Sequence, residues 1–164
     1  MMINVQKNDF YPDLQTYLLK NKVEAEILDL HVPMKTAQAA ADQLQVAIAQ
    51  IIKSILLIYK KTKEQKEYVL VVLPGDASVD LQKLADLKGW NKNKISFANS
   101  DAVLQHTGFP AGGTPPIGHK EPLAVVMNKR LLDLDVGYAG GGKPEWLLKI
   151  SPKEIQRLTC AQLL

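Results

Sequence analysis

The 164-residue chain lacks features that whole classes of protein require. Its single cysteine, Cys160, excludes an internal disulfide and a cysteine-cluster zinc site, and we expect it to be a packing residue. The three histidines, His31, His106 and His119, lie far apart without metal-binding spacing, so we expect no metal and no cofactor. No apolar run approaches the roughly 20 residues of a membrane helix, and the polar start "MMINVQKNDFYPDL" does not fit a signal peptide. We therefore expect a cytoplasmic protein with no membrane partner.

Excess charge of one sign is also scarce. The chain has 20 Lys and Arg against 17 Asp and Glu, a formal net charge of +3. A domain that grips duplex DNA usually carries more positive charge, so we expect no DNA partner, although another polyanion is permitted. The densest lysines, in "YKKTKEQKEY" (59–68), alternate with glutamates and predict a solvated hairpin loop.

The pattern of apolar residues predicts a single α/β domain over residues 1–164. Helical spacing indicates helices over 11–21, 37–44, 79–90, 101–107 and 151–159, with one more in the first half of "IAQIIKSILLIY". Apolar runs indicate strands over 25–30, 54–59, 68–76, 94–98, 123–128, 134–139 and 145–150. Strands and helices do not alternate strictly, and the last three strands are consecutive. This order favours a curved mixed sheet flanked by helices over a doubly wound parallel sheet.

Capping residues mark several predicted helix ends. Thr36 and Ser100 are predicted N-caps, and Gly89 is expected to close the helix before it. "SPKE" at 151–154 combines Ser, Pro at the first helical position and Glu at the third, which predicts a capping box. Three further acidic residues lie at turn and cap positions, where local hydrogen bonding explains them: Asp76, Asp80 and Asp101.

The segment "GFPAGGTPPIGHK" (108–120) concentrates four glycines and three prolines. Gly113 and Gly118 have the interval of a phosphate-binding P-loop, but His119 stands where that motif needs lysine. Pro115 and Pro116 also remove two backbone N–H donors from the arc that would bind phosphate. We therefore reject a nucleotide loop. A rigid substrate loop and a plain structural turn both remain open.

One lysine interrupts an apolar run. In "IIKSILLI" (51–58), Lys53 and Ser54 are flanked by isoleucine and leucine. Two interpretations remain open: Lys53 snorkels to the surface, or its ammonium lies at the lip of a cleft and faces a carbonyl or phosphate. A second glycine-rich segment, "GGGK" (140–143), joins two predicted strands and is interpreted as a tight hairpin or bulge.

Together these segments resemble the YbaK/prolyl-tRNA editing family of aminoacyl-tRNA deacylases. The resemblance runs from "TAQAAADQL" through "IIKSILL", "VVLPGDASVDLQKLA" and "TGFPAGGTPPIGHK" to "GYAGGGKPEWLLKISP" and "KISPKEIQRLT". It implies a compact α/β domain with a curved mixed sheet. It also implies metal-independent hydrolysis of the ester that joins a wrong amino acid to the 3′ end of a tRNA, with an aminoacyl-tRNA synthetase as an optional second partner.

The resemblance also implies the site residues. The family's functional lysine corresponds to Lys53, and its substrate loop is expected to contribute main-chain amides near Gly113 and Gly118 to catalysis. The remaining substrate-binding residues are expected to be Thr36, Ser54, Gly112, Thr114, Pro115, Pro116, Ile117, His119, Gly140 and Gly141.

Two positions depart from the family members specialised for cysteinyl-tRNA. Those members carry serine where this chain has Gly140, and aspartate where this chain has Leu147. The departures argue against cysteine and leave alanine, serine, threonine or a small non-protein amino acid open. Two alternative functions also stay open: a non-catalytic module that binds tRNA or a synthetase, and a hydrolase of another activated ester.

Overall fold

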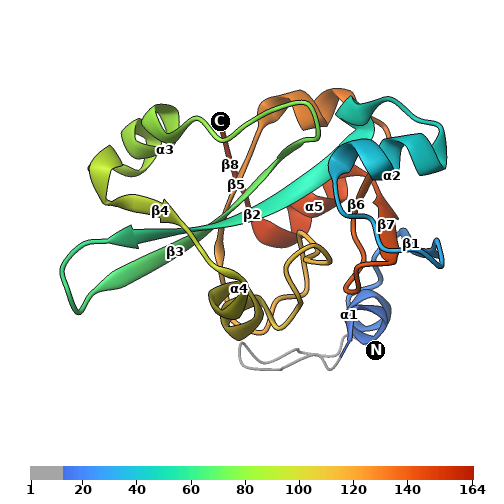
Figure 1. Ribbon diagram of the computed structural model, residues 1–164, viewed down its shortest axis with the longest axis horizontal. Helices are drawn as coiled ribbons and strands as arrows, with labels where there is room; N and C mark the ends of the chain where they lie inside the picture. The colour runs from blue at the N-terminus through green and yellow to red at the C-terminus, as the bar shows by residue number, and fades with distance from the viewer. Residues whose placement is uncertain (1–12) are drawn as a thin grey trace.

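A mixed sheet forms the centre of the protein in a computed structural model, which describes residues 13–164 (Figure 1). The strand order is β1-β7-β6-β2-β3-β5-β8, and β4 pairs with β2 outside this path. The strands are β1 (Ala25–Asp29), β2 (Ile51–Lys60), β3 (Lys66–Pro74), β4 (Ile95–Phe97), β5 (Ala124–Met127), β6 (Gly137–Gly140), β7 (Trp146–Ile150) and β8 (Gln162–Leu163). The α-helices are α1 (Leu14–Lys20), α2 (Ala37–Leu44), α3 (Leu81–Lys88), α4 (Ser100–Thr107) and α5 (Pro152–Thr159).

The strand pairing confirms the predicted mixed sheet. Strands β2 and β3 form a long antiparallel hairpin, and its loop is the lysine-rich segment predicted to be solvated. Strands β6 and β7 form a second antiparallel hairpin around the "GGGK" segment. In contrast, β6 runs parallel to β2, and β5 runs parallel to β3. The last three predicted strands therefore separate, with β5 on one side of the β2–β3 hairpin and β6–β7 on the other.

Local capping explains where α2 and α3 begin. The Thr36 side-chain oxygen accepts a hydrogen bond of 3.0 Å from the Ala39 N–H, which confirms the predicted N-cap of α2. Asp80 caps α3 in the same way through the Lys83 N–H. Helix α3 then ends at Gly89, which has the left-handed conformation (φ 67°) that glycine adopts most easily.

One predicted cap is wrong, and one predicted capping box does not form. The cap of α4 is Asn99, whose side chain accepts from the Ala102 N–H at 2.9 Å, while Ser100 is the first helical residue. An asparagine one position earlier reaches the same first-turn amides, so the cap shifts by one residue. At α5, Ser151 makes no side-chain cap hydrogen bond, although Pro152 stands in the first turn as predicted. The Glu154 side chain instead pairs with Arg157 one turn later, so no capping box forms.

Three further predictions need correction or a limit. The helix in the first half of "IAQIIKSILLIY" is only a 3₁₀ turn over Ile48–Gln50, because the β-branched run from Ile51 onward joins the sheet. Asp76 lies in a turn as predicted, but the largest influence on its carboxylate is a hydrogen-bonded ion pair with Arg130, 54 residues away. Helix α1 begins at Leu14 after the cap Asp13, and the residues predicted before that lie outside the described part of the chain.

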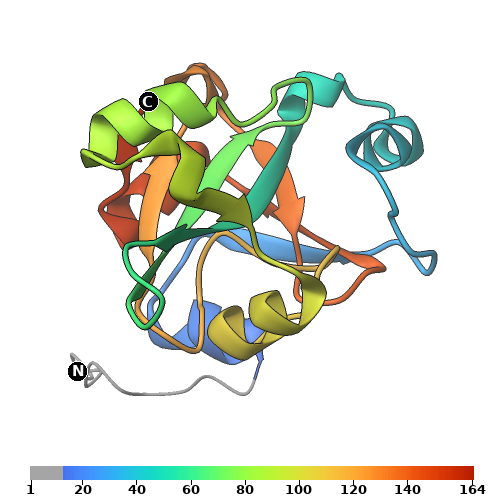
Figure 2. The same ribbon diagram turned by 60° about the vertical axis from the view of Figure 1, so that its left-hand side comes forward.

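Side-chain alternation along β2 and β3 divides the core into two faces. Leu57, Val71 and Leu73 pack with Leu84 of α3, which covers one face of the sheet (Figures 1 and 2). Leu56 and its neighbours on the other face pack with α1, α4 and α5. A third cluster joins the small residues of α2 to the start of β2 and to β7: Ala40, Ala41, Ile51 and Leu147. No helix within residues 13–164 has the length and apolar character of a membrane span.

Candidate functional site

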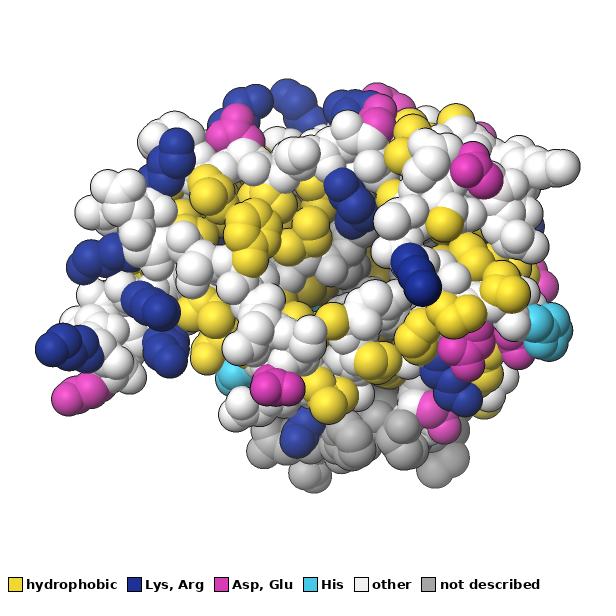
Figure 3. Space-filling view, in the orientation of Figure 1, with side chains coloured by type: hydrophobic (Ala, Val, Ile, Leu, Met, Phe, Trp, Pro, Cys, Tyr) yellow, Lys and Arg dark blue, Asp and Glu magenta, His cyan; other side chains and the backbone are white. Residues whose placement is uncertain are grey.

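A cavity of about 240 Å³ lies where β2 and β6 separate. The two strands pair only at Ile51 with Tyr138 and Ile52 with Ala139. The same edge of β2 is next paired at Leu57, by β4. The sheet is therefore open for a few residues of β2, and helix α2 and the loop before β5 complete the walls of the opening. Figure 3 shows this face hollowed, with apolar side chains inside the hollow and basic side chains beside it.

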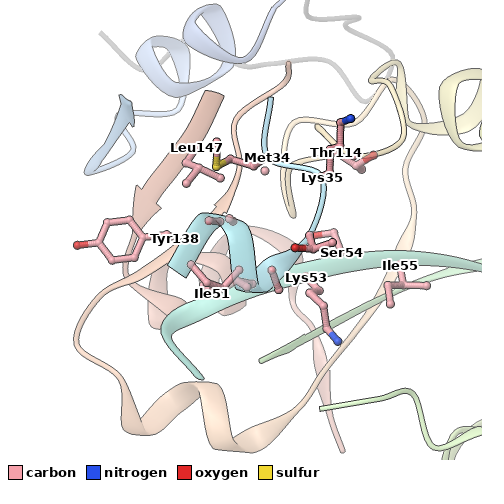
Figure 4. A pocket seen from close by; sticks show the side chains of 16 residues that line it. Met34, Lys35, Ile51, Lys53, Ser54, Ile55, Thr114, Tyr138 and Leu147 are labelled. Carbon is pink, nitrogen blue, oxygen red and sulfur yellow. The ribbon is translucent and has the colours of Figure 1, made fainter. Parts of the chain in front are cut away.

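Four segments supply the cavity wall (Figure 4). The start of α2 and the residues before it contribute Met34, Lys35, Thr36, Ala37 and Ala40. Strand β2 contributes Ile51, Ile52, Lys53, Ser54 and Ile55. The glycine- and proline-rich loop contributes Gly112 and Thr114, and the β6–β7 hairpin contributes Tyr138, Ala139, Gly140 and Leu147. Most of the wall is apolar, so the few polar groups determine how a ligand is oriented.

The two glycine-rich segments pack directly against each other. A Cβ placed on Gly140 would lie 2.2 Å from the Thr114 carbonyl oxygen. A Cβ on Gly113 would lie 2.7 Å from the Lys143 carbonyl carbon. Both distances are shorter than a van der Waals contact, so only glycine allows this approach of two backbones. The segments that sequence analysis treated separately therefore form one wall.

Lys53 lies at the lip of the cavity. Its side chain is partly buried, and its ammonium donates a hydrogen bond to the carbonyl oxygen of Ala77, in the loop after β3. The neighbouring carboxylate of Asp76 has a pKa below its usual value. The main cause is the hydrogen bond from Arg130, and the positive charge of Lys53 adds a smaller effect. The ammonium thus lies beside the cavity within a small network of charges.

His119 does not line the cavity but fixes the shape of the loop. Its ring Nε2 lies 2.7 Å from the carbonyl oxygen of Pro115. Burial lowers the pKa of His119 to about 4, although the hydrogen bond to Pro115 opposes the shift. The ring is therefore neutral at pH 7, and because a carbonyl can only accept, Nε2 carries the proton and donates.

The structure brings only part of the predicted site together at the cavity. Six of the predicted residues line it: Thr36, Lys53, Ser54, Gly112, Thr114 and Gly140. Seven do not: Gly113, Pro115, Pro116, Ile117, Gly118, His119 and Gly141. Ile117 is a core residue with 1% of its surface exposed, and Gly118 faces the Tyr17 ring of α1. Both residues therefore shape the loop and do not contact the cavity.

Sequence analysis missed several wall residues. Met34 and Lys35 precede the Thr36 cap, and Tyr138 precedes the second glycine-rich segment. Main-chain hydrogen bonds hold the first of these segments against the hairpin, since the N–H of Met34 donates to the Pro144 carbonyl at 2.9 Å. The only signal in the sequence was adjacency to a cap and to a glycine cluster. Among residues 13–164, no three His, Cys, Asp or Glu side chains are grouped to hold a metal.

Comparisons with known proteins identify relatives of this chain. Residues 31–158 match the family described as the aminoacyl-tRNA editing domain. A protein of Enterococcus faecalis with the provisional name Cys-tRNA(Pro)/Cys-tRNA(Cys) deacylase EbsC is 28% identical over 127 residues, 77% of this chain and 74% of that protein. The proline–tRNA ligase of Fervidobacterium nodosum is 36% identical over 87 residues, which are 53% of this chain but only 14% of the ligase.

Solved structures share the whole fold. The crystal structure of the hypothetical protein APE2540 superimposes with a TM-score of 0.82 at 26% identity, and the match covers 92% of this chain and 95% of that one. A crystal structure provisionally described as a trans-editing enzyme for prolyl tRNA synthetase gives a TM-score of 0.77 at 30% identity, covering 93% of this chain and 90% of that one. The chain therefore belongs to the aminoacyl-tRNA editing domain family, a family of aminoacyl-tRNA deacylases.

Proposed function

We propose that this protein is a trans-editing hydrolase that removes a small wrong amino acid from the 3′ end of a tRNA, tRNA(Pro) or a related one. The observation that carries the proposal is the cavity with Lys53 at its lip and two close-packed glycine-rich segments as its wall. A cavity of about 240 Å³ has room for a small aminoacyl group. The family of the chain and the names of its relatives support the same substrate class.

The reaction requires few catalytic side chains. The oxygen of a water molecule attacks the carbonyl carbon of the ester, the bond to the ribose oxygen breaks, and that oxygen takes up a proton as the free tRNA leaves. We assign Lys53 the task of stabilising negative charge, either on the terminal phosphate or on the carbonyl oxygen as it develops. Among the described residues, none that line the cavity is a histidine, an aspartate or a glutamate. We therefore propose that the 2′-hydroxyl of the terminal adenosine orients the water.

The amino acid that is removed is proposed to be alanine, serine, threonine or a small non-protein residue. Size alone discriminates weakly, since one methylene in an apolar pocket changes the transition-state free energy by roughly 1–3 kcal/mol. The wall residues Gly140 and Leu147 differ from those of cysteine-specialised relatives, so we propose that cysteine is not the preferred substrate.

A panel of aminoacyl-tRNAs tests the proposal. tRNA(Pro) is charged separately with alanine, serine, threonine, cysteine and proline, and release of the amino acid is measured with the protein and with buffer alone. We expect at least one small wrong amino acid to be released much faster than proline, with or without excess EDTA. Release no faster than in buffer for the whole panel would contradict deacylation, and loss with EDTA that zinc restores would contradict the metal-independent mechanism.

A further inference from the structure

We infer that two main-chain groups, the N–H of Ser54 and the carbonyl oxygen of Gly140, bind the aminoacyl group. The N–H donates to the carbonyl oxygen of the ester, and the Gly140 oxygen accepts from the protonated α-amine. The inference rests on the proposed function and deepens it, because it makes a free α-ammonium a requirement of the substrate. The evidence is the direction of the main-chain groups along β2 and the point at which its pairing with β6 ends.

Alternation along β2 fixes which residues face the open edge. The Ile51 carbonyl accepts from the Gly75 N–H, beyond the end of β3, so odd-numbered residues of β2 direct their main-chain groups toward β3. The Leu56 carbonyl accepts from the Ala98 N–H, on the β4 side. Even-numbered residues, Ser54 among them, therefore direct N–H and C=O toward β4 and β6.

The parallel ladder between β2 and β6 stops one bond short of Ser54. Its register, Ile51 with Tyr138 and Ile52 with Ala139, places hydrogen bonds from the Ile52 N–H to the Tyr138 oxygen and from the Gly140 N–H to the Ile52 oxygen. The next bond would join the Ser54 N–H to the Gly140 oxygen. That bond would extend the register to Lys53 and Gly140, and the strands do not pair there.

The β2–β6 ladder ends before the bond that would join these two groups, and neither group takes part in the main-chain hydrogen bonds of turns and loops within residues 13–164. Gly141 directs its N–H to Trp146 of β7, so its neighbour Gly140 faces β2 and not β7. The Ser54 side-chain oxygen is buried and also lacks a partner among the described residues. A buried polar atom without a partner, as Ser54 Oγ is here, is rare in folded proteins, because it gives up its hydrogen bonds to water. Two residues with unpaired main-chain groups on the wall of one cavity indicate a ligand that supplies the missing partners.

An aminoacyl ester has the matching groups. Its α-ammonium is a donor and its carbonyl oxygen an acceptor, and they are separated by only two carbon atoms. Seated between Ser54 and Gly140, the ester replaces the missing ladder bond with one bond to each strand. As water adds to the carbonyl carbon, negative charge grows on the oxygen that the Ser54 N–H contacts, so this bond strengthens in the transition state.

A backbone substitution tests the donor. Serine at position 54 is replaced by its α-hydroxy analogue, glyceric acid, which turns the N–H into an ester oxygen and keeps the side chain. The matched control places leucic acid at Leu57, whose N–H faces β3 in the ladder and lies away from the cavity. We expect the change at 54 to lower kcat about 10²-fold, as for other lost oxyanion donors, with little change in Tm. The change at 57 should lower Tm and keep the activity of the folded protein. Wild-type kcat, or a Tm loss at 54 as large as at 57, would overturn the inference.

A change in the substrate tests the acceptor. The best aminoacyl-tRNA of the panel is compared with the same tRNA after acetylation of the α-amine, with wild-type protein throughout. We expect acetylation to lower kcat/KM at least tenfold more than it lowers hydrolysis in buffer alone, because it removes the positive charge and two of the donors available to the Gly140 oxygen. Equal rates for the two esters would overturn the acceptor role and leave the deacylase function standing. If the unmodified ester is not hydrolysed either, the proposed function falls and this inference with it.

Discussion

The main-chain N–H of Gly142 donates a hydrogen bond of 2.8 Å to the carbonyl oxygen of Gly113, 29 residues earlier in the chain. This bond holds the β6–β7 hairpin against the loop before β5. On either side of it, Gly140 and Gly113 allow the two backbones to approach more closely than any side chain would permit. The wall of the cavity therefore depends on glycine in both segments at once.

Gly140→Ala should disrupt this wall. The new Cβ would lie 2.2 Å from the Thr114 oxygen, a backbone atom that can move only if the loop moves. We expect a stability loss of about 1–3 kcal/mol, as for other overpacked sites, and at least a tenfold loss of deacylation. The control is Gly89→Ala, which has a strained φ of 67° but no atom within 4 Å of the new Cβ. It should lose a similar 1–2 kcal/mol and keep its activity. Full activity in folded Gly140→Ala would show that the close approach does not shape the site.

Lys53→Ala should abolish most deacylation while the circular dichroism spectrum stays unchanged. Loss of one preorganised electrostatic contact typically lowers kcat by ~10²–10³. Lys53→Arg keeps the charge but replaces a compact ammonium with a planar fork, so we expect intermediate activity. Lys83→Ala, an exposed change of the same charge on α3, controls for weaker tRNA attraction. A wild-type rate in Lys53→Ala would contradict a role of Lys53 in catalysis, and its hydrogen bond to Ala77 would be its only established role.

The stability of the protein should depend on His119 between pH 6.5 and 4. The folded pKa is about 4, below the ordinary value of 6.5, so in this range the unfolded chain binds a proton that the folded protein does not. The contribution of His119 to the free energy of unfolding is fully present above pH 6.5. As the pH falls below 6.5, this contribution decreases by at most ~1.4 kcal/mol per pH unit, and below pH 4 it no longer changes.

His119→Gln isolates this effect, because glutamine can donate to the Pro115 oxygen but does not titrate in this range. Free energies of unfolding measured by urea denaturation at pH 7 and pH 5 should differ more in the wild type than in His119→Gln. Parallel pH curves for the two proteins would show that His119 titrates alike in the folded and unfolded states.

Ser54 and Thr107 form a contrasting pair of hydroxyls. Within residues 13–164, Ser54 Oγ is buried without a partner, whereas Thr107 Oγ1 donates to the Val103 carbonyl at 2.7 Å and accepts from the Phe109 N–H at 3.0 Å. Ser54→Ala removes an unpaired group and should raise the free energy of unfolding by about 1 kcal/mol, while Thr107→Val should lower it by about 1–3 kcal/mol. Urea denaturation of both variants gives the comparison. A destabilised Ser54→Ala protein would mean that the hydroxyl is satisfied in solution.

Much of the secondary structure of this protein could be predicted from local sequence patterns. The cap at Thr36, the periodicity of α3 and its end at Gly89 were predicted, because they depend on residues within a turn or two of each other. The β2–β3 hairpin was predicted for the same reason, and the mixed character of the sheet was predicted from the order of strands and helices along the chain. The order of the lysine-bearing strand and the two glycine-rich segments also indicated the family, and with it Lys53 as the central candidate.

Tertiary structure alone decided where the cavity lies and which groups face it. The ladder between β2 and β6 joins residues 87 positions apart in the chain and ends at Ile52 with Ala139, and no local pattern encodes that end point. The packing of Gly140 on Thr114 and the ion pair of Asp76 with Arg130 also join distant segments. The loop composition was visible in the sequence, but only the fold separates Thr114 at the cavity from Ile117 in the core, because burial depends on what the rest of the chain places on each side.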